Sequence, residues 1–313
     1  MNQIVAVGLS ATIQQTISFN TLQKEAVNRS TGYRLDASGK AVNAARVLNQ
    51  LAAGCVTAVC PLGEQNADHF LELAAADNLP VAWVPFPGRV RQCYTLLEPL
   101  SGQATELVVS EPVKAADFTA PSERLLFLIQ KKLSLPGVNA LLLAGSRPLS
   151  FPEDLCLRIC QLAEDAGIPV MADFHGKDLN LVLEDSVPAI VKINELEFCG
   201  TFGLGFPPAE ADLIRTLEEK SASLNTTIVV TRGAQDVFAA VNGVFLRSPV
   251  KPVVARNAIG CGDSFSAGFL HEWLSDRDIA AALEKGSWCA SRNALNYRPG
   301  SILDAAAATE QIW

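Results

Sequence analysis

The stretch from Asn257 to Phe269 combines the residue types that a phosphate-handling site requires. Gly260 and Gly262 flank Cys261, and the carboxylate of Asp263 follows immediately. Glycines allow a tight turn whose bare N–H groups, at the positive end of a helix, attract an anion. A carboxylate there would repel phosphate, but it can accept a proton from a hydroxyl that attacks the phosphate. The alternative is a glycine-rich turn with an aspartate helix cap.

The turn Gly260-Cys261-Gly262-Asp263 resembles the Gly-Ala-Gly-Asp signature of ribokinase-like sugar kinases, the PfkB family. The resemblance implies phosphoryl transfer from ATP, with Mg²⁺, to a hydroxyl of a small molecule. It implies that Asp263 is the base and that the amides from Gly260 to Gly262 form the anion hole. It also implies an α/β fold of three αβα layers, with a mostly parallel central sheet and a small β-sheet lid. The motifs together resemble most the branch that contains 1-phosphofructokinase and tagatose-6-phosphate kinase.

The composition is that of a globular protein. Of the 313 residues, 49% are hydrophobic and 19% are charged, and the net charge is -8. The negative charge argues against a nucleic-acid partner, because binding to a phosphate backbone requires a basic surface. No apolar run reaches the length of a membrane span, and the N-terminus lacks a signal-like segment. The eight cysteines lack the paired spacing of a zinc site, so we expect free thiols in a cytoplasmic protein.

Two kinds of pattern follow each other along the chain. From Asp117 onward, short apolar runs alternate with helical periodicity, which predicts a mostly parallel sheet covered on both faces. Half-exposed strand patterns interrupt the alternation near residues 14–36 and 90–110. We therefore expect one kinase domain over residues 1–313, with the lid strands inserted at these two places. Asn242-Gly243 separates two further strand patterns and predicts a hairpin.

Three segments on the nucleotide side also resemble the family. Lys192-Ile193-Asn194-Glu195-Leu196-Glu197 is similar to its Lys-Pro-Asn-x-x-Glu segment, which implies that Asn194 and Glu197 order Mg²⁺-bound water beside the phosphates. The alternative is a capping box at a helix start. Thr231-Arg232-Gly233 is similar to the Thr-x-Gly turn, which implies that Thr231 and Gly233 contact ATP. Asn293, in the last predicted helix, falls in a segment that resembles the lining of the adenine pocket.

The substrate half departs from the family pattern. Where relatives have Asn-Pro-Ala-x-Asp after the first strand, this chain has Ser10-Ala11-Thr12-Ile13-Gln14. Gln14 can bond a sugar hydroxyl, but without the charge that strengthens such a bond. Ser38-Gly39-Lys40-Ala41-Val42-Asn43 stands where the family has Gly-Gly-Lys-Gly-x-Asn. Gly39, Lys40 and Asn43 keep that pattern and are predicted to bind substrate, whereas Ser38 and Ala41 add Cβ atoms that we expect to reduce its space.

Arg29 and Arg91 match positions at which this branch holds a phosphate already present on its substrate. With Lys40 they would bring three cations to a phosphate monoester. Each arginine taken alone is better explained as a solvated charge at a strand edge. The joint match predicts a small sugar phosphate as the substrate, of the fructose 1-phosphate or tagatose 6-phosphate type.

Two other functions stay open at this point. One is a kinase of an unphosphorylated sugar or a nucleoside. The other is a catalytically silent sensor that binds a sugar phosphate or a nucleotide. The altered lid motif favours the sensor, and the intact Gly260, Gly262 and Asp263 oppose it, because binding alone needs no base. Exposed strand edges in the lid also predict a homodimer formed through the lid.

Overall fold

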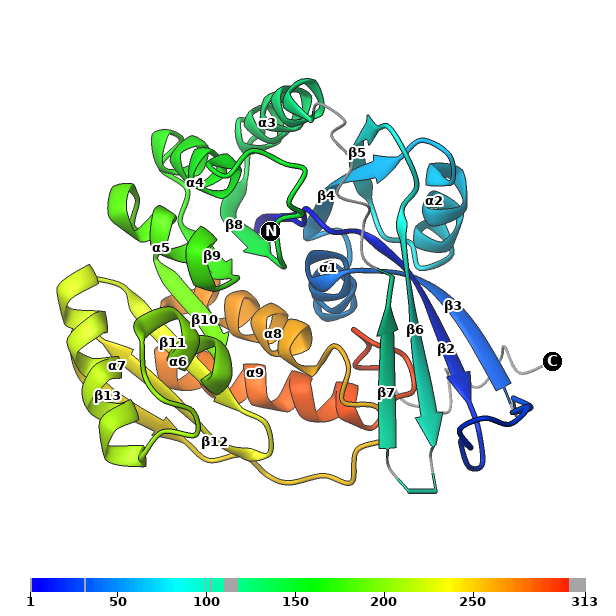
Figure 1. Ribbon diagram of the computed structural model, residues 1–313. Coiled ribbons are helices and arrows are strands. Elements are labelled where there is room, and N and C mark those ends of the chain that lie inside the picture. The colour runs from blue at the N-terminus through cyan, green and yellow to red at the C-terminus, as the bar shows by residue number, and fades with distance from the viewer. Residues whose placement is uncertain (1, 31, 99, 102, 110–117, 304–313) are drawn as a thin grey trace.

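The computed structural model describes residues 2–30, 32–98, 100–101, 103–109 and 118–303. Residue 110, at the end of the second predicted insertion, lies outside these ranges. So do Asp117, where the predicted alternation of strands and helices begins, and the end of the predicted domain after residue 303. Within the described ranges the chain forms two sheets and the helices that cover them (Figure 1).

The large sheet has nine strands in the described residues, in the order β13-β12-β11-β10-β9-β8-β1-β4-β5. The pairs β11–β12 and β12–β13 are antiparallel, and the other pairs are parallel. Asn242 and Gly243 both have positive φ, 50° and 81°, as a two-residue type I′ turn requires, so the predicted hairpin is confirmed. The strands are β1 (Gln3–Val7), β4 (Val56–Gly63), β5 (Val81–Phe86), β8 (Val138–Ala144), β9 (Val170–Asp173), β10 (Ile190–Asn194), β11 (Thr227–Arg232), β12 (Gln235–Val241) and β13 (Val244–Ser248).

Helices cover both faces of this sheet and bury two apolar cores. One face carries α1 (Lys40–Leu51), α2 (Ala67–Ala76), α8 (Cys261–Asp276) and α9 (Ile279–Ala294). The other carries α3 (Thr119–Leu133), α4 (Leu155–Asp165), α5 (Gly176–Asp185), α6 (Glu195–Phe202) and α7 (Glu210–Leu224). Small residues bring the helices around the site close together: a Cβ at Gly268 of α8 would lie 2.6 Å from Sγ of Cys289 on α9. The middle of α8 thereby packs directly against α9.

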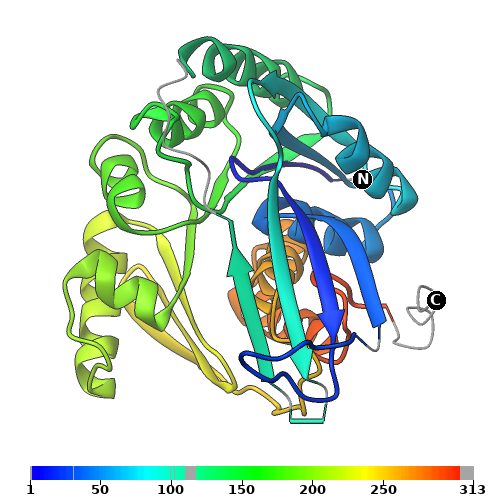
Figure 2. The same cartoon turned by 45° about the vertical axis from the view of Figure 1, so that its right-hand side comes forward.

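The small sheet contains β2 (Thr12–Ser18), β3 (Gly32–Ser38), β6 (Arg91–Glu98) and β7 (Gln103–Val108), in the order β3-β2-β6-β7. Figure 2 shows it extending away from the large sheet as a separate layer. Both predicted insertions contribute, because β2 pairs in parallel with β6. The predicted arrangement of three α/β layers, a large mostly parallel sheet and a second small sheet is confirmed.

Two elements differ from the sequence expectation. β2 begins at Thr12, two residues before the predicted insertion near residues 14–36, so Gln14 lies inside a strand. The helix α5 was not expected, because only Leu179 and Val182 of its ten residues are buried and its periodic signal is correspondingly short. All eight cysteines are free, and Cys261 alone among them is not buried.

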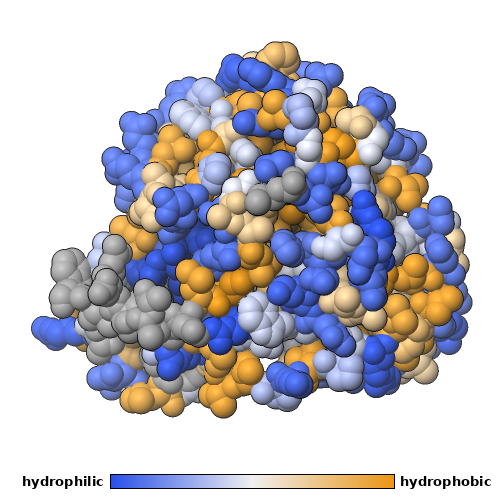
Figure 3. All heavy atoms as spheres, turned by 180° about the vertical axis from the view of Figure 1, so that it is seen from behind, coloured by the Kyte–Doolittle hydropathy of each residue, from blue (hydrophilic) through white to orange (hydrophobic). Residues whose placement is uncertain are grey.

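The surface seen from behind is a mosaic in which apolar side chains form separate patches among polar ones (Figure 3). Across the described residues, none of the helices combines the length and the apolar character that crossing a membrane would require.

Candidate active site

The N-terminus of α8 forms the turn that the sequence singles out. Gly260 has a φ of 80°, and a Cβ there would lie 2.7 Å from the Gly300 nitrogen, so this position requires glycine. The N–H groups of the first turn have no partner inside the helix and form the positive end of its dipole. One of the three predicted anion-hole amides, that of Cys261, already donates to the Ala258 carbonyl at 3.3 Å. An anion at this turn would share that amide with the loop.

Asp263 lies in the first turn of α8 and is 7% exposed. Its Oδ2 accepts a hydrogen bond from Nδ2 of Asn43, on α1, at 2.8 Å. Burial and then repulsion from Asp173 raise the pKa of Asp263 to about 6, against the opposing charge of Lys40. A general base works best when its pKa lies near the operating pH. Asp263 therefore has the proton affinity that a base needs near neutral pH.

Asp173, at the end of β9, is a second buried carboxylate. Its carboxylate forms ion pairs with Nζ of Lys192 at 3.1 Å and Nζ of Lys40 at 3.4 Å. It also accepts a hydrogen bond from Oγ of Ser266 at 2.6 Å. Burial acts to raise the pKa of Asp173, but the two ammonium groups hold it below its usual value. Asp173 is therefore ionised at neutral pH, and its charge is what repels the ionised form of Asp263.

Lys40 is the first residue of α1 and is placed there by Gly39. Gly39 has a φ of 116°, and a Cβ on it would lie 2.8 Å from the Ser10 carbonyl oxygen. Nζ of Lys40 also lies 3.5 Å from Oε1 of Glu197, on α6. Attraction to Asp173, its strongest partner, raises the pKa of Lys40. Lys40 is a permanent cation between two carboxylates.

Asn194 and Glu197 form the capping box at the start of α6. Oδ1 of Asn194 accepts from the Glu197 amide at 2.8 Å, and Oε2 of Glu197 accepts from the Asn194 amide at 2.9 Å. The second oxygen, Oε1, lies 3.7 Å from Nε2 of His175. No group of three His, Cys, Asp or Glu side chains placed to hold a metal occurs in the described part of the chain. A Mg²⁺ ion would fit only as one held largely by phosphate and water, a mode that this ion favours.

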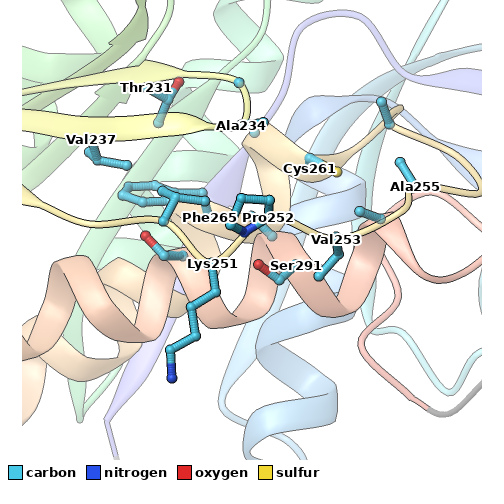
Figure 4. Close-up of a pocket in the computed structure, with 17 residues that line it drawn as sticks. Thr231, Ala234, Val237, Lys251, Pro252, Val253, Ala255, Cys261, Phe265 and Ser291 are labelled. Carbon is cyan, nitrogen blue, oxygen red and sulfur yellow. The ribbon is translucent and has the colours of Figure 1, made fainter.

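A pocket of about 300 Å³ lies beside the turn of α8 (Figure 4). Thr231 and Gly233, from the end of β11, line it together with Cys261 and Gly262. Burial raises the pKa of the Cys261 thiol to about 11, so Cys261 contributes neutral surface. Sequence reasoning missed the apolar and hydroxyl-bearing part of the lining, which comes from β12, from the segment after β13 and from α8 and α9: Val237, Val250, Pro252, Val253, Phe265, Ser287 and Ser291. The spacing of Ser287, Ala290, Ser291 and Ala294 is the helical signal that would have found it.

Asn293 does not line this pocket. Its side chain is fully buried and braces the loops around the α8 turn: Oδ1 accepts from the Gly300 amide at 2.6 Å, and Nδ2 donates to the Ile259 carbonyl at 2.9 Å. Nδ2 also lies 3.3 Å from Sγ of Cys261. The predicted contact of Asn293 with a nucleotide is replaced by a supporting role one layer behind the pocket wall.

Gln14 and Arg91 lie on neighbouring strands of the small sheet. Gln14 is 4% exposed, and its Nε2 donates to Oγ1 of Thr95 at 2.8 Å. Nε and Nη2 of Arg91 donate to Oγ1 of Thr12 at 3.2 and 3.1 Å. Burial raises the pKa of Glu106, on β7, and the nearby charge of Arg91 opposes that rise, so Arg91 has a carboxylate for a neighbour.

Arg29 is not brought to the other two predicted phosphate ligands. Arg91 pairs with Thr12 at the start of β2, whereas the loop that carries Arg29 leaves β2 after Ser18. Six residue steps along a strand separate these ends by about 20 Å. Within one chain, therefore, Lys40 and Arg91 lie toward the root of the small sheet and Arg29 lies at its far end.

The side chains of Ser38 and Ala41, which stand where the family has glycine, do not project into open space. The Cβ of Ala41 packs against Gly8, where an added Cβ would lie only 2.8 Å away. Ser38 is 3% exposed, and its Oγ donates to Oδ1 of Asn43 at 2.9 Å. The expected loss of substrate space is therefore wrong for Ala41, which faces the core, and Ser38 is part of a hydrogen-bond chain to Asp263.

Comparison with known proteins gives consistent matches. The pfkB family carbohydrate kinase model matches residues 1–305. A 1-phosphofructokinase of Rhodobacter capsulatus is 29% identical over 290 residues, which cover 89% of this chain and 86% of that protein. A possible 1-phosphofructokinase of Thermotoga maritima has the same fold, with a TM-score of 0.85 at 18% identity, over 99% of this chain and 97% of that one.

Escherichia coli phosphofructokinase-2 also shares the fold, with a TM-score of 0.83 in each of two structures. Its complex with fructose-6-phosphate is 20% identical and covers 94% of both chains. Its tetrameric inhibited form is 21% identical and covers 94% of this chain and 95% of that one.

We expect Asp263→Asn to stabilise the protein at pH 8. The folded-state pKa of Asp263, about 6, lies above its usual value of 3.8, so its contribution to stability is present below pH 4 and is lost as the pH rises through 6. Removing the charge should add about 2–3 kcal/mol to the free energy of unfolding at pH 8 and little at pH 4.

Urea unfolding of the variant and the parent at both pH values measures this difference. Asp212→Asn, which changes a half-exposed carboxylate, is the control and should change stability little at either pH. Equal stability of Asp263→Asn and the parent at pH 8 would show that the buried charge carries no cost.

Proposed function

Because the chain belongs to the pfkB family of carbohydrate kinases, we propose that it transfers the γ-phosphoryl group of ATP to a hydroxyl of a small sugar phosphate, of the fructose 1-phosphate or tagatose 6-phosphate type. The observation that carries the proposal is Asp263, buried in the first turn of α8 with a pKa raised to about 6. A binding protein gains nothing from a buried carboxylate whose charge is destabilised, whereas a general base does.

Asp263 takes the proton of the attacking hydroxyl in this mechanism. The first-turn amides of α8 hold the transferred group, and Lys40 balances the charge that develops around Asp263 and Asp173. A bound Mg²⁺ ion would neutralise charge on the γ-phosphoryl group that ATP donates. Thr231 and Gly233 would contact the nucleotide in the neighbouring pocket, and Asn194 and Glu197 would orient metal-bound water. Glu197 has one oxygen outside its capping hydrogen bond for this purpose, Oε1.

The substrate phosphate is assigned to Lys40 and Arg91, which lie near the root of the small sheet. Gln14, on β2, and Asn43, beside Asp263, are assigned as uncharged partners for sugar hydroxyls. Arg29 reaches this phosphate only if it comes from a second copy of the chain, since its own loop is at the far end of β2.

One observation favours the alternative, a kinase of an unphosphorylated sugar. Lys40 is already paired with Asp173 and Glu197, and Arg91 has Glu106 for a neighbour. Each carboxylate reduces the free positive charge available to a substrate phosphate. Substrate comparison decides between the two.

Incubation with ATP and Mg²⁺ and a panel of phosphorylated and free sugars should give the highest kcat/KM with a phosphosugar. Asp263→Asn should lower kcat by roughly 100-fold or more on that substrate, because the hydroxyl loses its proton acceptor, while ATP binding changes little. Coupled ADP release measures turnover. Better turnover of a free sugar would establish the alternative, and near-parent turnover by Asp263→Asn would remove that residue from the chemistry.

Arg91→Ala should raise the KM for the sugar phosphate about 10-fold or more and leave the KM for ATP nearly unchanged, since Arg91 is assigned to the substrate alone. Arg89→Ala is the matched control, because Arg89 is an exposed arginine two residues earlier in the chain. An unchanged KM in Arg91→Ala, or an equal change in both variants, would contradict the assignment.

We further propose that two copies of the chain pair through the small sheet. All six residues of β7 are exposed, and Leu107 is 51% exposed on this strand, which is the edge of the small sheet as the described residues form it. Leu107 lies opposite Tyr94, and Leu96 and Ile17 continue the same half-exposed face on the neighbouring strands. An apolar face beside an unpaired strand edge is a favourable place for association.

Leu107→Glu should shift the protein from dimer to monomer in sedimentation velocity, because it places a charge in the middle of this apolar face. Val108→Glu, on the opposite face of the same strand, is the control and should leave the dimer intact. A parent protein that sediments as a monomer at every concentration would contradict the pairing, as would a dimer that tolerates Leu107→Glu.

A further inference from the structure

The side-chain amide of Asn43 is the one uncharged group that donates to Asp263 in the hydrogen bonds described above. Its Nδ2 donates to Oδ2 of Asp263 at 2.8 Å. Its Oδ1 accepts from Oγ of Ser38 at 2.9 Å and from Nη1 of Arg46 at 3.1 Å. The other charged groups that act on Asp263 are Asp173 at the end of β9, Lys192 on β10 and Lys40 on α1.

Arg46 decides which end of that amide faces Asp263. A hydroxyl such as that of Ser38 can donate or accept, so it would tolerate either orientation of the amide. A guanidinium can only donate, so it requires the amide oxygen on its own side. The nitrogen of Asn43 is thereby directed at Asp263 whether or not Asp263 carries a proton.

Arg46 can impose this orientation because its own position is fixed. It is 2% exposed in the middle of α1. Its Nε donates to Oδ2 of Asp77 at 2.9 Å, Nη1 also donates to the Pro299 carbonyl at 3.2 Å, and Nη2 donates to the Ala37 carbonyl. Arg298 pairs with Asp77 as well, and with Asp36 at 2.9 Å. The guanidinium is held from β3, α2 and the C-terminal loop at once.

We infer that Arg46 is a positioning residue for Asp263: it acts through Asn43 and keeps an N–H, never an oxygen, against the carboxylate. The inference rests on the proposed role of Asp263 as base. A hydrogen bond donated to a carboxylate favours its ionised form. Without Arg46 the amide is free to turn, and its oxygen would then accept a hydrogen bond from protonated Asp263 and favour the form that cannot act as a base.

The test is the pH at which Asp263 titrates in Arg46→Lys, which keeps the positive charge beside Asp77. The acid limb of the pH profile of kcat/KM should move upward by about 1 pH unit, the scale of one hydrogen bond to a charged group, and activity should recover toward the parent above pH 8. Arg298→Lys is the matched control: Arg298 shares Asp77 with Arg46, and its pairs in the structure are with Asp36 and Asp77 rather than Asn43. Its acid limb should stay in place. An unmoved limb in Arg46→Lys, or the same shift in both variants, would overturn the inference.

Carboxyl-carbon NMR of ¹³C-aspartate-labelled protein follows Asp263 without relying on turnover, with Asp263→Asn identifying the signal. The expected upward shift in Arg46→Lys supports the positioning role even if no sugar is phosphorylated, an outcome that would overturn only the proposed function. If Arg46→Lys does not fold, Asn43→Ser takes its place, because it leaves the other hydrogen bonds of Arg46 intact. It should show the same upward shift, and an unmoved Asp263 signal in that variant would overturn the inference.

Discussion

The structure depends on keeping two carboxylates buried close together at the carboxyl end of the large sheet. Asp173 is ionised because Lys192 and Lys40 both reach it, and burial together with that fixed charge raises the pKa of Asp263. Without the lysines, burial would drive a proton onto Asp173. Without Asp173, only burial would oppose the charge of Lys40, and the pKa of Asp263 would be lower. Asp173 thus carries the permanent negative charge of the pair, and Asp263 is the residue that can gain or lose a proton near neutral pH.

The elements that supply these groups are held by unusually close packing. Gly39 lets α1 begin against Ser10, and Gly260 lets α8 begin against Gly300. A Cβ at Gly262 would already lie 3.1 Å from Nζ of Lys192. The contacts at Gly39 and Gly260 leave no room for a side chain, and a Cβ at Gly262 would displace the Lys192 ammonium by a few tenths of an ångström. The lysines and carboxylates are therefore placed largely by the backbone. Preorganisation of this kind is how an enzyme avoids reorganising its charges during reaction.

The sequence predicted those parts of the fold and site that are local. The hairpin at Asn242-Gly243 follows from two adjacent residues that accept positive φ, and the turn at Gly260 from glycines beside a helical pattern. The places of Arg29, away from Lys40 and Arg91, and of Asn293, buried beside the pocket, could not be predicted because they depend on where other segments lie. No sequence pattern around Arg29 indicates at which end of the small sheet its loop lies. Asn293 contacts a loop seven residues further along the chain, at Gly300.

The burial of Arg46 could not be predicted from the sequence for a related reason. A single arginine in an apolar helix is normally a residue whose charge reaches solvent. Its burial becomes apparent only when Asp77, Ala37 and Pro299, from three other parts of the chain, are seen to surround it. Long-range charge pairing of this kind has no periodic signature, so hydrophobic patterning cannot reveal it.

Gln14 departs from the family pattern, and a charged residue on the neighbouring strand explains why. In the antiparallel pair β2–β3, Gln14 lies directly opposite Asp36, and both side chains are buried. Asp36 is already committed to Arg34 and Arg298. A second carboxylate at position 14 would face Asp36 at cross-strand distance, about 5 Å between Cβ atoms, where like charges destabilise a sheet. The amide avoids that repulsion and donates instead to Thr95, which leaves its oxygen as an uncharged acceptor. A sugar hydroxyl at this position would therefore meet a weaker partner than a carboxylate. The cause is Asp36 on the neighbouring strand, which is retained there by its ion pairs with Arg34 and Arg298.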